Sequence, residues 1–127
     1  MATPFLRVEI QRHKSDCAVA CLAMFLGLSY EEVLMAFRHN VIASGATTRQ
    51  ILSAAARLGH RLKWTRKVDL ETDIGLLALD SRKWPQQHLV VLKEELIVDS
   101  DATIWDQDVY LAAYEAVPLS IIKAEAA

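Results

Sequence analysis

The chain is poor in the residues that mark several specialised classes of protein. Its 127 residues include only 2 cysteines, 4 glycines and 3 prolines. Two cysteines are too few for a disulfide scaffold, and the scarcity of glycine and proline excludes collagen-like and low-complexity chains. Because 53% of the residues are hydrophobic and 24% are charged, we expect one core and a single domain over residues 1–127.

A strong charge of one sign and long apolar runs are missing as well. The formal net charge is −2, so no overall field attracts nucleic acid or an anionic membrane. No run approaches the roughly 20 apolar residues of a membrane span, and residues 1–10 lack the pattern of a signal peptide. Two cysteines four residues apart favour a reducing compartment. We therefore expect a cytoplasmic protein without a membrane span or a nucleic-acid partner.

The first half of the chain has the pattern of helices. Ser15 and Asp16 precede an apolar run over residues 17–26, and Gly27 suits a left-handed helix end. Two capping boxes predict the helices that follow, at residues 30–38 and 48–58: Ser29 with Glu32, and Thr47 with Gln50.

The second half has the pattern of strands. Apolar residues alternate with basic ones over residues 62–68, and short apolar runs follow at 76–79, 88–92, 96–98 and 117–122. Asp106 or Asp108 is expected to begin a short helix that ends near Tyr114. Helices followed by strands indicate an α+β fold, with the N-terminal helices packed on a C-terminal antiparallel sheet.

Cys17 is the first candidate for chemistry. It falls in the first turn of the expected helix, where unpaired backbone N–H groups and the helix dipole stabilise a thiolate. Cys21 lies one turn further along, where the dipole is weaker and packing is the ordinary role of a cysteine. The alternative for Cys17 is also a packing role.

A catalytic thiol needs a base, and His88 is the only histidine that begins an expected strand. If the next hairpin turns on Lys93 and Glu94, Asp99 lies directly opposite His88 on the same face. A carboxylate in that position would orient the imidazole toward the thiolate. Gln11, six residues before Cys17, would supply an amide N–H to an oxyanion, together with the backbone N–H of Cys17.

Together these residues resemble a known family. The segment from Gln11 to Met24, with Asp16-Cys17 and the helical Ala20-Cys21-Leu22-Ala23-Met24, is similar to the opening of the C39 family of papain-fold cysteine peptidases. The strand that begins at His88 and the Asp99-Ser100 pair resemble its later motifs. The resemblance implies that Cys17 is the nucleophile, His88 the base, Asp99 the orienting acid and Gln11 the oxyanion donor. It implies no cofactor and a peptide or protein substrate.

Two positions depart from the family pattern. Ala18 stands where the family usually has glycine, and Ser100 stands where proline normally follows the acid. Family members best known for this domain carry it on peptide-exporting ABC transporters, where it removes leader peptides after a Gly-Gly pair. The phosphate-binding motif of such transporters is missing from these residues, so that role does not transfer.

Other functions use some of the same residues. A peptide- or protein-binding module would keep the groove without turnover, and a thiol sensor would require both Cys17 and Cys21 to be accessible. Zinc held by the two cysteines with His13 and His88 lacks a second ligand motif. Basic residues around Trp64 are interpreted as the solvated face of a strand rather than a nucleic-acid surface. We therefore expect a papain-like cysteine peptidase, with the silent binding module as the alternative.

Overall fold

The structure is a computed structural model that describes residues 16–125. Its helices are α1 (Cys17–Leu26), α2 (Tyr30–Ala36), α3 (Val41–Ser44), α4 (Thr48–Arg57) and α5 (Gln107–Tyr114). Its strands are β1 (Leu62–Thr65), β2 (Ile74–Asp80), β3 (His88–Lys93), β4 (Leu96–Val98), β5 (Ile104–Asp106) and β6 (Val117–Ala124). The strands form one antiparallel sheet in the order β1-β6-β2-β3-β4-β5, so the α+β prediction is confirmed.

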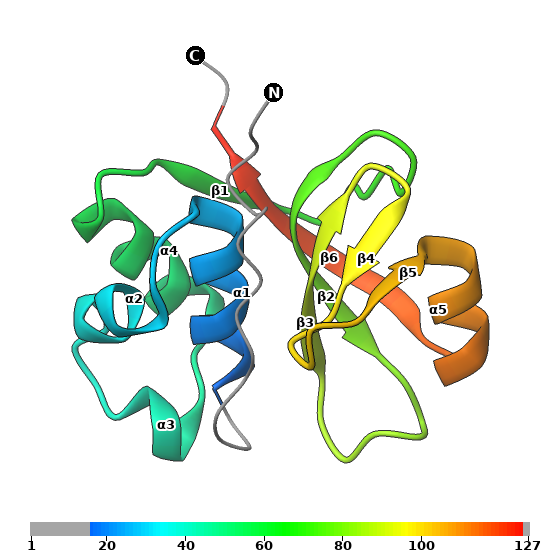
Figure 1. Ribbon diagram of the computed structural model, residues 1–127, viewed down its shortest axis with the longest axis horizontal. Helices are drawn as coiled ribbons and strands as arrows, with labels where there is room; N and C mark the ends of the chain where they lie inside the picture. The colour runs from blue at the N-terminus through cyan, green and yellow to red at the C-terminus, as the bar shows by residue number, and fades with distance from the viewer. Residues whose placement is uncertain (1–15, 126–127) are drawn as a thin grey trace.

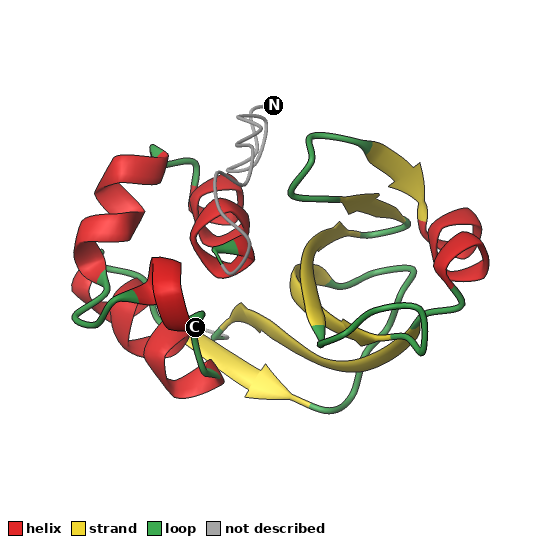
Figure 2. Cartoon of the chain, turned by 90° about the horizontal axis from the view of Figure 1, so that it is seen from below, coloured by secondary structure: helices red, strands yellow, loops and turns green. Residues whose placement is uncertain are grey.

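The sheet separates two apolar cores. Figures 1 and 2 show α1 to α4 gathered on one side of the strands and α5 on the other. Alternate residues of each strand point to opposite faces. Leu76 and Val91 therefore join the core beneath α1, α2 and α4, whereas Leu77 and Leu92 join the core beneath α5. The helical half and α5 are fixed to the same sheet, and the ends of that sheet position the site.

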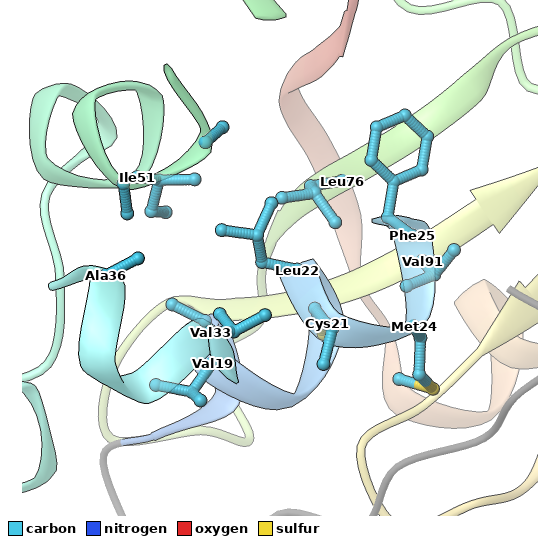
Figure 3. Close-up of a cluster of buried hydrophobic side chains, with 14 of the residues drawn as sticks. Val19, Cys21, Leu22, Met24, Phe25, Val33, Ala36, Ile51, Leu76 and Val91 are labelled. Atoms are coloured by element: carbon cyan, nitrogen blue, oxygen red, sulfur yellow. The ribbon is translucent and has the colours of Figure 1, made fainter. Parts of the chain in front are cut away.

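Helix α1 is the buried centre of the helical half. Every residue from Ala18 to Phe25 is buried, because this run is apolar on all sides. Figure 3 shows Leu22 and Cys21 among side chains from α2, α4 and the sheet, including Val33, Ile51 and Val91. The first residue of the helix is thereby held by a rigid, fully packed element.

Local sequence signals begin α2 and α4 and end α1 as expected. Both capping boxes are formed at the starts of α2 and α4, and Gly27 ends α1 with a φ of 70°. The start of α1 is different, because Asp16 is its N-cap residue and makes no side-chain cap bond. The predicted capping residue, Ser15, lies outside the described residues.

Several element predictions were wrong in detail. The hairpin between β3 and β4 turns on Glu94 and Glu95, not on Lys93 and Glu94, and Lys93 pairs with Leu96. This register opposes Leu92 to Ile97 and leaves both glutamates in solvent. Helix α2 ends at Ala36, and β1 ends at Thr65. The short elements α3 and β5 were not predicted.

Within residues 16–125, no single helix is both long and apolar enough to cross a membrane. Taken together, α1 and α2 meet that test by length and composition, but they are bent by 114° at the break between them.

Candidate active site

Cys17 is the first residue of α1 and is half-buried. The residue before it, Asp16, is fully buried, and its carboxylate accepts a hydrogen bond from the hydroxyl of Tyr30. The carbonyl of Asp16 accepts the first helical bonds, from the N–H groups of Val19 and Ala20. The start of α1 is therefore anchored by buried groups, and the Cys17 sulfur is placed where the unpaired N–H groups of a helix are concentrated.

His88 and Asp99 form a hydrogen-bonded pair. The Nε2 of His88 lies 2.7 Å from Oδ1 of Asp99, and the two side chains are 25% and 9% exposed. Asp99 directly follows β4, and the observed register, extended by three residues beyond the Val91–Val98 pair, places Asp101 rather than Asp99 opposite His88. The predicted direct cross-strand pair is thus wrong, and the two residues are diagonal neighbours. A shift of two residues keeps both on the same face, so they still meet.

The imidazole interacts with the thiol as well. Burial lowers the pKa of His88, but hydrogen bonds to Asp99 and to Cys17 and the charges of both groups outweigh it, raising the pKa to about 9. His88 is therefore protonated at neutral pH and both ring nitrogens donate. Because Nε2 is bound to Asp99, Nδ1 is the ring nitrogen that remains for the hydrogen bond to Cys17.

Asp99 is held by more than His88. Its Oδ2 accepts a hydrogen bond of 2.7 Å from the Tyr110 hydroxyl, and its Oδ1 accepts another from the Ser100 N–H at 2.7 Å. Burial raises the pKa of Asp99, but the bonds from His88 and Tyr110 lower it below its ordinary value. For Tyr110, burial and the bond to Asp99 both raise the pKa. The carboxylate is therefore a fixed anion beneath the imidazole.

Tyr110 was not found from the sequence. It is a fully buried residue of α5, an element from the other side of the sheet, and no local pattern connects it with Asp99. The only signal was its type, because a buried tyrosine hydroxyl usually has a polar partner. Trp84 contacts the site as well, because its ring meets that of His88 edge-on, with centroids 5.4 Å apart.

Cys21 has a different environment. Its side chain is fully buried, and its Sγ donates to the carbonyl of Leu89 at 3.2 Å. Burial, followed by the charges of Cys17, Asp99 and Asp16, raises the pKa of the Cys21 thiol well above its ordinary value. A thiol in this state is a poor nucleophile, and it lacks the access that a resolving cysteine needs.

Two clefts, each of about 350 Å³, meet at Cys17 and His88. We call the first the apolar cleft; it lies between β2, β6 and the start of α4, over Leu76, Ile122 and Ile51. We call the second the aromatic cleft, and it lies between the loop before β3 and α5, lined by Trp84, Tyr110, Tyr114, Asp99 and Asp101. The sulfur and the imidazole therefore stand where an extended chain lying along both clefts would pass.

Two sequence predictions concern other parts of this site. Gln11 lies outside the described residues, as does His13 of the zinc alternative. Within residues 16–125, no cluster of three or more His, Cys, Asp or Glu side chains has the arrangement of a metal site. Trp105 packs against Tyr110 and Tyr114 behind the aromatic cleft.

The arrangement of helices and sheet is the α+β papain-like fold that the resemblance implied. The particular similarity is to a solved structure described as a double glycine motif protease from an AMS/PCAT transporter, in complex with the leader peptide. The TM-score is 0.65 at 21% sequence identity, and the match covers 93% of this chain and 91% of that one. No family model and no curated protein matches the sequence. The chain therefore has the fold of a double-glycine protease.

Proposed function

We propose that this domain is a cysteine peptidase in which Cys17, His88 and Asp99 carry the reaction. The observation that carries the proposal is the continuous link from the Cys17 thiol through His88 to the buried carboxylate of Asp99. Such a link is the arrangement of nucleophile, base and orienting group that thiol and serine hydrolases share. The fold, shared with a protease, supports the same class of reaction.

In the acylation step, the Cys17 thiolate attacks the carbonyl carbon of the substrate, and a C–S bond forms. The carbonyl oxygen becomes an oxyanion, and the N–H groups at the start of α1 and the amide of Gln11 are the proposed donors to it. The protonated His88 then gives its proton to the departing amine as the C–N bond breaks. The raised pKa of His88 keeps that proton in place at neutral pH.

In the deacylation step, water attacks the resulting thioester. His88, now neutral, takes one proton from the water, the C–S bond breaks, and the acid product leaves. Asp99 remains ionised throughout and stabilises the imidazolium in both steps. No group beyond the chain, the peptide and water is required for this balance.

The proposed substrate is a peptide or protein segment in extended form. The similar protease was solved with a leader peptide, which supports a peptide as the ligand of these clefts. We also propose that the domain works in the cytoplasm, because both of its cysteines are free thiols and a reducing compartment keeps them so.

Alkylation with iodoacetamide tests the nucleophile. Near neutral pH, mass spectrometry should find Cys17 modified roughly 100-fold faster than Cys21, because Cys21 is buried and bonded to Leu89. His88→Ala should slow the reaction at Cys17 by about tenfold or more, because the imidazolium that stabilises the thiolate is gone. The matched control is His60→Ala, which changes an exposed histidine outside both clefts.

Peptide hydrolysis tests the activity itself. Turnover of a Gly-Gly-containing peptide library should be lost in Cys17→Ala and reduced by a factor of about 100 or more in His88→Ala. If Cys17 is inert in the folded protein and no peptide is cut, the domain is a binding module that keeps the groove. If Cys17 and Cys21 are modified equally, the thiol sensor is supported instead.

A further inference from the structure

The apolar cleft contains more space than a glycine substrate would use. Its volume is about 350 Å³, against roughly 30 Å³ for one molecule in liquid water. Small residues in the lining leave this space open, among them Ala46, Ala78 and Ser120. Ala78 and Ser120 are opposite each other on β2 and β6, so no large side chain fills the cleft at that pair.

The lining combines an apolar floor with neutral polar side chains, among them Ser44, Thr48, Gln86 and Gln87. Leu76 and Ile122 are paired across β2 and β6, and together with Ile51 of α4 they form an almost fully buried floor. Trp64, 42% exposed, adds an aromatic wall. Among the described residues His88 is the only ionisable side chain of the lining apart from the Cys17 thiol.

The apolar cleft and the aromatic cleft differ in charge. The aromatic cleft contains two carboxylates, on Asp99 and Asp101, whereas the apolar cleft contains none within the described part of the chain. A basic side chain placed in the apolar cleft would lose hydration and would meet the like charge of His88 with no carboxylate among the described lining residues. A glycine placed there would leave the exposed part of the Trp64 ring in contact with water.

We infer that the apolar cleft binds a large apolar side chain of the substrate, such as leucine or phenylalanine, at a residue adjoining the cleaved bond. This inference rests on the proposed function and deepens it, because it names the substrate class of the same site. It also departs from a requirement for a Gly-Gly pair.

A set of fluorogenic peptides that differ at one residue tests the inference. Glycine, leucine, phenylalanine, lysine and aspartate are placed in turn at each residue adjoining the cleaved bond. At one of these positions leucine or phenylalanine should raise kcat/KM over glycine by roughly 10- to 100-fold, the effect of burying one such side chain. Values for glycine equal to or above those for leucine at every position would overturn the inference.

A charged substitution inside the apolar cleft tests whether this cleft binds the selected side chain. Ser120→Glu places a carboxylate beside the apolar floor, so the ratio of kcat/KM for lysine over leucine should rise by about tenfold or more at that position. The matched control is Ser53→Glu on α4, which adds the same group between Arg49 and Arg57 at helical spacing and outside the apolar cleft. The control should leave the ratio unchanged, and an equal change in both variants would overturn the assignment.

Binding separates the inference from the proposed function. Cys17→Ala cannot form a thioester, and its dissociation constants for the same peptides are measured by fluorescence anisotropy. Tighter binding of leucine than glycine peptides, with no cleavage by the wild type, would keep the inference and refute the peptidase. Equal binding of leucine and glycine peptides, with efficient cleavage at Gly-Gly by the wild type, would refute the inference and keep the peptidase.

Discussion

The titration of His88 is the property that the site geometry determines most directly. Two groups favour its protonated form, Asp99 at 2.7 Å from Nε2 and the sulfur of Cys17, and they raise its pKa to about 9 despite burial. Asp99→Asn keeps a side chain of the same shape and an oxygen that accepts from Nε2, but removes the charge. An opposite charge at this range shifts a pKa by about 1–3 units. We therefore expect the His88 midpoint to fall by about 1–2 pH units in the variant.

The assay is an NMR titration of the imidazole resonances, which requires no enzymatic activity. A fall of 1–2 units corresponds to about 1.4–2.8 kcal/mol in the preference of His88 for its charged form. Cys17→Ala should lower the midpoint by less, since the bond to Asp99 contributes more to the raised pKa than the bond to Cys17. The other histidines of the chain serve as internal references. A midpoint unchanged in Asp99→Asn, or lowered more by Cys17→Ala, would refute the reasoning.

Stability should follow the same titration. A histidine whose pKa is higher in the folded chain than in the unfolded one stabilises the fold fully below the unfolded value, about 6.5. That contribution is lost as pH rises through about 9. The free energy of unfolding in urea should therefore decline between these limits, and the decline should be smaller in Asp99→Asn. Equal slopes in the two proteins would contradict the linkage.

Two further substitutions test the supports of the site and the sheet. Tyr110→Phe removes the 2.7 Å bond to buried Asp99 and should cost about 1.5–3 kcal/mol of unfolding free energy, measured in urea. It should also raise the pKa of Asp99, because the bond from Tyr110 lowers it. Tyr114→Phe, whose hydroxyl makes no hydrogen bond within residues 16–125, is the control, and an equal loss in both would contradict the role given to Tyr110. Gly75→Ala places a Cβ against the backbone carbonyl of Ile122 and should cost roughly 1–3 kcal/mol, whereas a thermal midpoint equal to the wild type would show that β2 and β6 separate easily.

Much of the secondary structure was predictable because its causes are local. The capping boxes at Ser29 and Thr47 act through side chains and N–H groups three residues apart, so the sequence contains both partners. The end of α1 depends on the single left-handed residue Gly27. Elements without such signals were missed or displaced. Strand β5 has only three residues, and its pairing with β4 defines it. The turn at Glu94 has a φ of 54°, a conformation that glycine or asparagine usually indicates, but the residue here is a glutamate.

The sequence by itself determined where chemistry could occur: a cysteine in the first turn of a helix, a histidine at the start of a strand, and a carboxylate near the end of the next. These positions follow from local spacing. Only the tertiary structure decided that Asp99 and Cys17 raise the pKa of His88, that Tyr110 fixes Asp99 from across the sheet, and that burial keeps the Cys21 thiol from acting as a nucleophile. It also decided the volume of the apolar cleft, which depends on how β2, β6 and α4 come together. Burial and long-range hydrogen bonds depend on which segments pack together, and that information is distributed over the whole chain rather than held in any one motif.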